Sequence, residues 1–560
     1  MKIALAQQNY HIGNFANNTK KIIEAIKQAK QEGADLIVFS ELCVCGYPPR
    51  DFLEFNDFIE QCEFSVKEIA SYCVEIAALI GTPVRNNHSK GKKLHNAALF
   101  LENGKVQQEI YKTLLPTYDI FDENRYFEAA DSWSVIPFQG VKMAVTICED
   151  IWNIGDNQLY RVSPMDELMG QEPDIMINLS ASPFDYTHAE DRKSIIKANV
   201  QKYRIPMIYC NAVGSQTELV FDGQSMVFDD NGNMCSQMNS FTEDLQYIEW
   251  HKEKGFASAI SLPQYQIPER LLEPEQLLPN LNIAAVYDAL VLGITDYFTK
   301  MGFKKAILGS SGGIDSAVTL ALAVAALGKE QVTAVLMPSP YSSDHSVNDA
   351  IALSEQLGNP YHVLPINMVN TAMLETLDPF FSGTPFGLAE ENIQSRIRGN
   401  MLMAIANKQG FILLNTSNKS ELSTGYGTLY GDMAGGLGVL GDCYKTQVYA
   451  LARYINSTKP TIPESIITKA PSAELRPGQK DSDSLPDYEV LDQILYQYIE
   501  RTQGPNEIKS MGFDSSLTDR ILKLVNTNEY KRNQFCPIIR VSSKAFGVGR
   551  RMPIVGKYLS

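Results

Sequence analysis

The chain has 560 residues, of which 44% are apolar and 20% charged, and a formal net charge of −16 at pH 7. This length predicts more than one domain, because single hydrophobic cores stop growing at about 250–300 residues. The negative charge argues against a broad nucleic-acid surface, which needs a basic patch. The nine scattered cysteines do not suggest a disulfide framework and fit a reducing cytosol. Without a signal-peptide pattern or an apolar run of the ~18 residues that span a membrane, we expect a cytoplasmic protein that binds neither nucleic acid nor membrane.

Residues 1–260 alternate short apolar runs with amphipathic stretches, which is typical of an α/β domain built in layers. Two stretches have the helical period, residues 17–31 and 191–203. The runs that we expect to form strands are 3–7, 36–40, 76–80, 97–101, 141–147, 175–179, 207–211 and 225–228.

Residues 261–282 separate this domain from the rest of the chain. The stretch 262–280 has four prolines and little periodicity, which indicates a linker. From residue 283 a second alternation begins, with strands expected at 306–308, 331–337 and 411–415. We therefore expect a second α/β domain at 283–560 with a doubly wound sheet.

Three polar residues follow apolar runs in the first domain. Glu41 comes just after the run 36–39, Lys112 follows Ile110, and Cys148 follows the run 141–147. Singly, each has an ordinary interpretation: an acid at a helix start, a solvated lysine and a buried thiol. In this order, and in the contexts FSEL, YKTLLP and CED, they resemble the Glu-Lys-Cys triad of the nitrilase, or carbon–nitrogen hydrolase, family.

This resemblance implies a nitrilase-like α/β sandwich that hydrolyses an amide with a thiol. A base is needed, because a free cysteine is mostly protonated at neutral pH. Glu41 would take the proton, and Lys112 would place positive charge beside the tetrahedral oxyanion. By the same resemblance, Tyr118, Ser182 and, six positions later, His188 would contact the amino-acid end of the amide substrate.

The segment KKAILGSSGGIDSAVTLALAVAAL at 304–327 predicts a phosphate site. An apolar run breaks into GSSGG at 309–313, and a helical pattern begins at Ile314. The backbone N–H groups and the helix dipole at such a turn favour an anion, and the glycines let a phosphate approach closely. Asp315 lies in the first helical turn, where a divalent cation can bridge it to phosphates.

The spacing excludes the two commoner phosphate loops, G-x-x-x-x-G-K-[ST] and G-x-G-x-x-G. A G-G pair alone is typical of an ordinary tight turn. The hexapeptide S-G-G-x-D-S at 311–316, however, resembles the loop of ATP pyrophosphatases, which split ATP into AMP and pyrophosphate. The resemblance implies a Rossmann-like domain of the adenine nucleotide alpha hydrolase type, with ATP as co-substrate.

Together the halves resemble glutamine-dependent NAD synthetases over nearly the whole chain. The supporting motifs are ENIQSRIRGNMLM (391–403), NTSNKSELSTGYGTLYGD (415–432), YKTQVY (444–449), PSAEL (471–475), EYKRNQ and RMPIVGKY. The resemblance implies a homo-oligomeric ligase that uses glutamine, ATP and deamido-NAD in the final step of NAD biosynthesis. Ammonia released in the first half would displace AMP from an acyl adenylate in the second, after transfer inside the protein.

The same resemblance assigns residues in the second half and implies no prosthetic group. Mg²⁺ would be held by Asp315 and Glu421, since carboxylates suit a hard cation. The implied ATP contacts are Gly309, Ser310, Ser311, Gly312, Gly313, Ile314, Asp315, Ser316, Thr416, Glu421, Lys445 and Ser472. The implied deamido-NAD contacts are Asn392, Arg396, Tyr426, Gly427, Thr428, Leu429 and Lys531.

Local sequence leaves alternatives open for several of these residues. Arg396 and Arg398 lie in a helical pattern whose arginines are usually solvated, and Arg398 is assigned no role. Lys531 is close to Glu529, so a surface ion pair is as compatible with the sequence. Thr416 follows a strand and can cap the next turn.

Other amidotransferases fit less well. GMP synthetases use a Cys-His-Glu glutaminase, and asparagine synthetases of this type place the nucleophilic cysteine at the mature N-terminus, whereas this chain begins Met1-Lys2-Ile3. A tRNA-thiolating enzyme needs a catalytic cysteine pair and a basic face, for which Cys443, Cys536 and the net charge give little support. A non-enzymatic scaffold should have lost a catalytic residue type, but none is missing.

Overall fold

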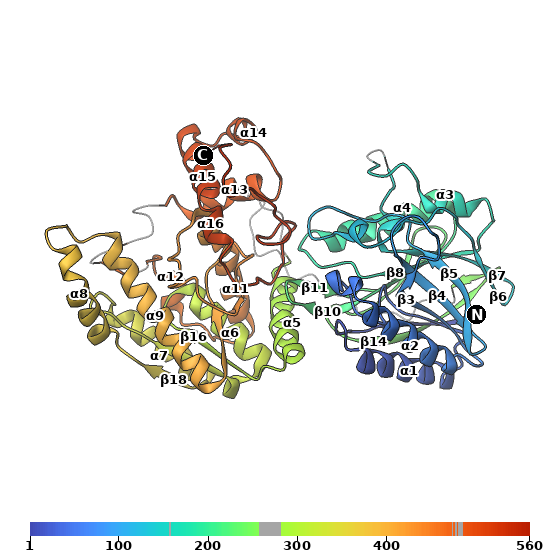
Figure 1. The fold of residues 1–560 in the computed structure, drawn as a ribbon, viewed down its shortest axis with the longest axis horizontal. Helices are drawn as coiled ribbons and strands as arrows, with labels where there is room; N and C mark the ends of the chain where they lie inside the picture. The colour runs from blue at the N-terminus through green and yellow to red at the C-terminus, as the bar shows by residue number, and fades with distance from the viewer. Residues whose placement is uncertain (156–157, 257–281, 473, 477–478, 480–484, 560) are drawn as a thin grey trace. The chain divides into compact units, whose positions relative to one another are not determined.

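The computed structural model describes residues 1–560 except 156–157, 257–281, 473, 477–478, 480–484 and 560. Apart from Asp185–Thr187, which group with the second unit, the described residues divide at 257–281 into two compact units (Figure 1). The predicted linker, 261–282, falls outside the described residues except for Asn282, which caps helix α5 (Ile283–Met301). No described helix is both long and apolar enough to cross a membrane.

The first unit contains two large mixed sheets. The order of the first sheet is β15 (Gly255–Phe256), β14 (Asp244–His251), β1 (Lys2–Gln7), β2 (Leu36–Val38), β3 (Ala77–Arg85), β4 (Leu94–Glu102) and β5 (Lys105–Tyr111). The order of the second is β13 (Met234–Gln237), β12 (Met226–Phe228), β9 (Met207–Asn211), β8 (Ile175–Ser180), β7 (Val141–Ile147) and β6 (Ile136–Phe138). A separate antiparallel pair is formed by β10 (Val213–Gln216) and β11 (Leu219–Asp222).

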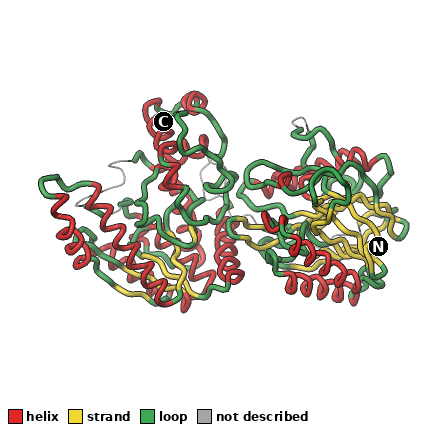
Figure 2. Tube along the Cα trace, viewed as in Figure 1, coloured by secondary structure: helices red, strands yellow, loops and turns green. Residues whose placement is uncertain are grey.

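The two sheets pack face to face and are covered by helices on their outer faces. Because successive side chains alternate between faces, one set of apolar residues, including Leu5, Val38, Val145 and Ile177, fills the space between the sheets. The other set packs under helices, which are α1 (Phe15–Gln31) and α2 (Asn56–Tyr72) on the first sheet and α3 (Pro164–Met169) and α4 (His188–Tyr203) on the second. This unit is therefore an α/β sandwich (Figure 2).

The sheet of the second unit is parallel throughout. Its order is β18 (Tyr361–Val363), β17 (Val332–Leu336), β16 (Lys305–Gly309), β19 (Phe411–Asn415) and β20 (Leu437–Gly438). The chain starts at the central strand β16, runs outward to β18 and then crosses back to β19. The strand order thus reverses beside β16, and doubly wound sheets bind ligands at the carboxyl ends of the strands at such a point.

Helices cover both faces of this sheet. On one face α5, α6 (Ile314–Leu327), α7 (Asp344–Leu357) and α11 (Lys445–Thr458) pack together, and on the other lies α9 (Leu388–Gln409) with α8 (Asn367–Phe381) against it. The remaining helices are α10 (Lys419–Thr424), α12 (Glu464–Thr468), α13 (Tyr488–Ile499), α14 (Pro505–Ser510), α15 (Ser515–Thr527) and α16 (Glu529–Arg532). The expected fold class, a sandwich followed by a doubly wound domain, is confirmed.

Sequence patterns found the central strands of the large sheets and missed several other elements. Strands β7, β9 and β19 have the predicted bounds, and β3 runs five residues further than expected, to Arg85. Helix α2 and strands β5 and β14 were not predicted. Both strands are only partly buried, so they lack the continuous apolar run that marks a central strand.

Candidate active sites in the two units

A buried lysine forms the centre of the first site. Lys112 Nζ donates to Glu41 Oε1 at 2.7 Å and to Glu123 Oε1 at 2.8 Å, and all three side chains are buried. Burial disfavours the charge, but the carboxylates of Glu123 and Glu41 outweigh it and hold the pKa of Lys112 well above its usual range. Lys112 is therefore a fixed cation beside Glu41.

Cys148 lies where β7 ends and a short 3₁₀ helix, Cys148–Ile151, begins. Its φ of 42° lies in the left-handed region, which is uncommon for a residue other than glycine and is often found where a reactive side chain is presented. Burial raises the pKa of the Cys148 thiol. The charge of Glu41 raises it further, and the charge of Lys112 lowers it. The thiol thus rests protonated, and Glu41 is the carboxylate whose charge acts on it most strongly.

One carboxylate ties together the loops that carry Lys112 and Cys148. Asp150 Oδ1 accepts from the N–H groups of Thr113 and Leu114 at 3.0 and 2.8 Å, and its Oδ2 accepts from Ile147 N–H at 2.9 Å. Asp150 is fully buried, so these bonds fix the ends of two separate strands relative to each other. This is the physical role of the last residue in the CED motif.

Sequence reasoning missed Glu123 and Asn96. Asn96 Nδ2 donates to Glu41 Oε1 at 2.7 Å, so that oxygen accepts from both Asn96 and Lys112. Burial raises the pKa of Glu123 to about 7 against the opposing charge of Lys112. Glu123 begins a short 3₁₀ helix, Glu123–Arg125, just after Asp119 and Asp122, and no pattern in the sequence distinguishes it from these acidic neighbours.

The predicted glutamine contacts lie in two places. Ser182 Oγ is 3.0 Å from His188 Nε2, and the His188 ring stacks on Trp152 with centroids 4.7 Å apart. The hydroxyl of Tyr118, an exposed residue, donates to Glu149 Oε1 at 2.9 Å, beside the thiol-bearing residue. The structure thus pairs Ser182 with His188 and places Tyr118 on the residue that follows Cys148.

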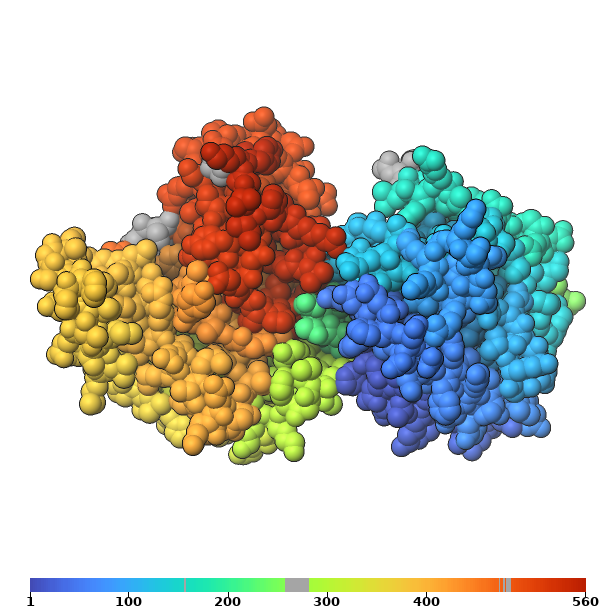
Figure 3. Space-filling model, viewed as in Figure 1, coloured from blue at the N-terminus to red at the C-terminus, as the bar shows by residue number. Residues whose placement is uncertain are grey.

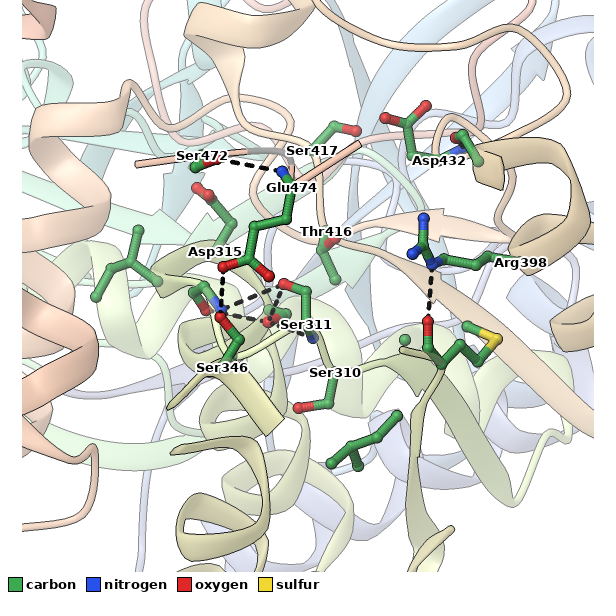
Figure 4. Close-up of a pocket in the computed structure, with 18 of the residues that line it drawn as sticks. Ser310, Ser311, Asp315, Ser346, Arg398, Thr416, Ser417, Asp432, Ser472 and Glu474 are labelled. Atoms are coloured by element: carbon green, nitrogen blue, oxygen red, sulfur yellow. Dashed lines mark hydrogen bonds between the residues drawn. The ribbon is translucent and has the colours of Figure 1, made fainter. Parts of the chain in front are cut away.

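A cavity of about 300 Å³ lies at the carboxyl ends of β16, β17 and β19 (Figure 4). The residues predicted to contact ATP all line it: Gly309, Ser310, Ser311, Gly312, Gly313, Ile314, Asp315, Ser316, Thr416, Glu421, Lys445 and Ser472. Ser310 Oγ is buried without a hydrogen-bond partner among the described residues, as expected of a donor kept for a ligand. The loop therefore has the geometry of an anion site at a helix N-terminus.

Lys445 holds the two carboxylates predicted to bind a metal. Its Nζ is 2.5 Å from Asp315 Oδ2 and 3.7 Å from Glu421 Oε1. Burial opposes the charge, but Asp315 and Glu421 raise the pKa of Lys445 above its usual range. No group of three or more His, Cys, Asp or Glu among the described residues can hold a metal. The pair suits Mg²⁺, which commonly takes one or two carboxylates with phosphate and water as its other ligands.

The predicted deamido-NAD residues meet beside this cavity. Asn392 Oδ1 accepts from the Thr428 hydroxyl at 2.8 Å, and Arg396 Nε donates to the Leu429 carbonyl at 3.2 Å. Lys531 Nζ donates to the Gly425 and Gly427 carbonyls at 2.7 and 2.9 Å. Of the residues in this predicted set, all of which the structure describes, Tyr426 alone lines the cavity.

Two sequence alternatives are resolved by these contacts. Glu529 pairs with Arg532 and Arg550, at 2.8 and 2.6 Å, while Lys531 turns to backbone carbonyls. Arg398, which the sequence left without a role, lines the cavity, as do Asp432, Lys469 and Glu474.

Comparisons with known proteins agree with both halves. Sequence models of two families match the chain, carbon-nitrogen hydrolase at residues 2–253 and NAD synthase at 286–535. The glutamine-dependent NAD(+) synthetase of Synechocystis sp. is 45% identical over 559 residues, which is 99% of this chain and 98% of that protein. The chain belongs to the glutamine-dependent NAD(+) synthetases. The Thermotoga maritima member is 39% identical over 100% of this chain and 99% of its own.

A solved structure supports the same membership. The glutamine-dependent NAD+ synthetase of Acinetobacter baumannii, in complex with ADP, has a TM-score of 0.76 and 38% identity and covers 99% of this chain and 98% of its own. The resemblance that the motifs indicated is thereby confirmed at the level of the family.

Glu123→Gln should change how glutamine hydrolysis depends on pH. In the unchanged protein, Glu123 gains a proton as the pH falls through about 7, so the Lys112 cation is then held by one carboxylate, that of Glu41, instead of two. The activity should therefore fall on that acid side. The variant should be roughly 10- to 100-fold less active, because a neutral amide replaces a charged hydrogen-bond acceptor of Lys112, and should lack the inflection near pH 7. The exposed Glu109→Gln is the matched control, and a Glu123→Gln enzyme that kept the inflection would contradict this role.

Gly312→Ala should weaken ATP binding, measured by titration calorimetry. Gly312 has φ of 74°, and a Cβ there would lie 2.1 Å from the Ser346 carbonyl oxygen, so the loop must move. We expect a loss of roughly tenfold or more, comparable to about 1.5–3 kcal/mol for a hydrogen bond to a charged group. Gly410→Ala is the control, because Gly410 has φ of 71° but open space around the added carbon. Equal ATP affinity in the two variants would show that the close approach is unimportant.

Proposed function

We propose that this protein makes NAD by ATP-dependent amidation of deamido-NAD, with ammonia that it releases from glutamine. The observation that carries the proposal is the presence, in one chain, of two sites with different chemistry. One combines Glu41, Lys112 and Cys148, which suits amide hydrolysis. The other combines a phosphate loop with Asp315 and Glu421, which suits ATP and a divalent cation. As a family member, the protein is a ligase.

We assign the glutaminase half-reaction to residues 1–260. Glu41 takes the proton of the Cys148 thiol, and the sulfur attacks the glutamine carboxamide carbon. Lys112 stabilises the oxyanion as a fixed cation, ammonia leaves, and water activated by Glu41 releases glutamate. Tyr118, Ser182 and His188 hold the amino-acid end of glutamine, by analogy with the family.

We assign the synthetase half-reaction to residues 283–560. The loop 309–316 binds the phosphates of ATP through backbone N–H groups and hydroxyls. A bound Mg²⁺, held by Asp315 and Glu421, would neutralise phosphate charge. Lys445 lies between these carboxylates and contributes a further cation. The cluster formed by residues 392, 396, 426–429 and 531 positions deamido-NAD for adenylation, and ammonia then displaces AMP.

The ammonia is best kept inside the protein. In neutral water most of it becomes ammonium, which is no nucleophile, so an internal route keeps it reactive and concentrated. A reducing, cytosolic location also suits the chain, because each of its nine cysteines is free and one of them is the proposed nucleophile.

We also propose a homo-oligomer, with α8 in an interface between copies. This helix has no buried residue, and it exposes 87% of Met368 and 83% of Phe380. It lies at the periphery of the second unit, in yellow in Figure 3. Exposed apolar side chains that gather on one element are typical of an interaction site.

Cys148→Ala should separate the two half-reactions. With deamido-NAD, ATP and Mg²⁺, we expect the variant to make NAD from ammonium and to lose the reaction with glutamine, because ammonium supply bypasses the thiol. NAD formation is followed by chromatography. The proposal is wrong if the variant loses both reactions equally, or if the unchanged protein makes no NAD from ammonium.

Met368→Asp combined with Phe380→Asp should reduce the molar mass measured by light scattering, because two charges would have to be buried in the interface. Met301→Asp, at an apolar position that is 58% exposed on α5, is the matched control and should leave the mass unchanged. An unaltered mass in the α8 variant would place the interface elsewhere.

A further inference from the structure

Helix α9 presents different residues to the two parts of the synthetase site. Asn392 and Arg396, four positions apart, contact the loop that contains Thr428 and Leu429. The cavity is lined instead by another row of the same helix, namely Ser395, Arg398, Gly399 and Leu402. Since a helix turns 100° per residue, Arg398 points about 160° away from Arg396 around the axis. Arg398 thus belongs to the cavity that holds the phosphate loop.

The guanidinium of Arg398 is anchored, and its terminal nitrogens donate to no other residue that the structure describes. Its Nε donates to the Met337 carbonyl at 2.9 Å, which fixes the direction of the group. Within the part of the chain that the structure describes, Arg398 forms no ion pair. Figure 4 shows the guanidinium pointing from the wall into the cavity. The terminal nitrogens are therefore placed to form a paired set of hydrogen bonds with an anion.

The nearest acidic side chains are engaged elsewhere. Asp432 Oδ1 accepts from Thr428 N–H at 2.6 Å, and Glu474 Oε1 accepts from Ser346 Oγ and Lys469 Nζ at 2.7 and 2.9 Å. Burial lowers the pKa of Arg398, with Asp432 and Glu474 opposing that effect from a distance. Arg398 is partly buried, and a partly desolvated cation without a paired anion is unfavourable, so a ligand is the natural partner for this one.

The shape of the cavity indicates which anion this is. Val335, Leu336, Met337, Leu402 and Leu413 give it an apolar wall that suits a purine base, while the loop 309–316 suits the terminal phosphates. In an ATP molecule that spans the two, the α-phosphoryl group is the anion closest to the base. Arg398 is held on that wall through Met337.

We propose that Arg398 binds the α-phosphoryl group of ATP, the phosphate that AMP retains. This inference rests on the proposed function. In the adenylation step, a carboxylate oxygen of deamido-NAD forms a bond to the α-phosphorus. The bond from that phosphorus to the bridging oxygen breaks, and pyrophosphate leaves with the electron pair. In the transition state the non-bridging α-oxygens carry negative charge, and a forked, permanently protonated guanidinium stabilises that charge.

The test compares Arg398→Ala and Arg398→Lys with Lys408→Ala, an exposed position on the same helix that does not line the cavity. NAD formation from ammonium, deamido-NAD, ATP and Mg²⁺ is measured, together with inhibition by AMP and by pyrophosphate. For Arg398→Ala we expect kcat to fall by roughly 10²- to 10³-fold, as for loss of an oxyanion donor. The AMP inhibition constant should rise, and the pyrophosphate constant should stay as in the unchanged protein. Arg398→Lys should recover part of the rate, because a point charge replaces the fork.

Other results would overturn the assignment. Weakened pyrophosphate inhibition with normal AMP inhibition would place Arg398 on the leaving phosphates. A raised KM for deamido-NAD alone would place it on the nicotinate carboxylate. Wild-type kinetics in both Arg398 variants would leave it without a substrate contact.

Two controls keep the result interpretable. Both Arg398 variants should keep the glutaminase activity and the thermal midpoint of the unchanged protein. If Arg398→Ala does not, the affinity of Arg398→Lys for AMP, measured by calorimetry, decides instead. If the unchanged protein makes no NAD, the proposed function fails. If it makes NAD and both Arg398 variants match it, this inference alone fails.

Discussion

The need to neutralise buried ammonium groups organises both halves of this protein. Lys112 is held by Glu41 and Glu123, and Lys445 by Asp315 and Glu421. A third buried lysine, Lys419, pairs with acids on other elements of the second unit in the same way. An unpaired charge in such a place would cost several kcal/mol, so each lysine draws together carboxylates from segments that are far apart in the chain. The positions of the reactive groups follow from this pairing.

The two lysine sites differ in exposure, and the difference suits their chemistry. Around Lys112 the carboxylate side chains are 0% and 7% exposed, so the cluster is closed and its charges act at full strength on a nearby thiol. Around Lys445 they are 17% and 18% exposed and face a cavity. A ligand can therefore reach these carboxylates directly.

The sequence predicted features that depend on neighbouring residues. The strand–loop–helix unit from β16 to α6 and the strand end at Cys148 are contiguous, so pattern and spacing were enough to find them. Glu123 and Arg398 were missed for a geometric reason. Glu123 acts through Lys112, which lies on a different segment. Arg396 and Arg398 are both arginines and lie two positions apart on one helix. Which of the two arginines faces the cavity depends on how α9 packs on the sheet, and the local sequence does not specify that orientation.

Helix α9 has a consequence for how this protein can diverge. One row of its side chains contacts the loop 426–429, and another row lines the cavity beside the loop 309–316, on a single rigid helix. A one-residue insertion upstream in the helix would turn both rows by about 100° at once. The orientation of the side chains at this loop and at this cavity is therefore coupled through one helix. New acceptor preferences can arise by changing side chains on one row, but not by shifting the register of the helix.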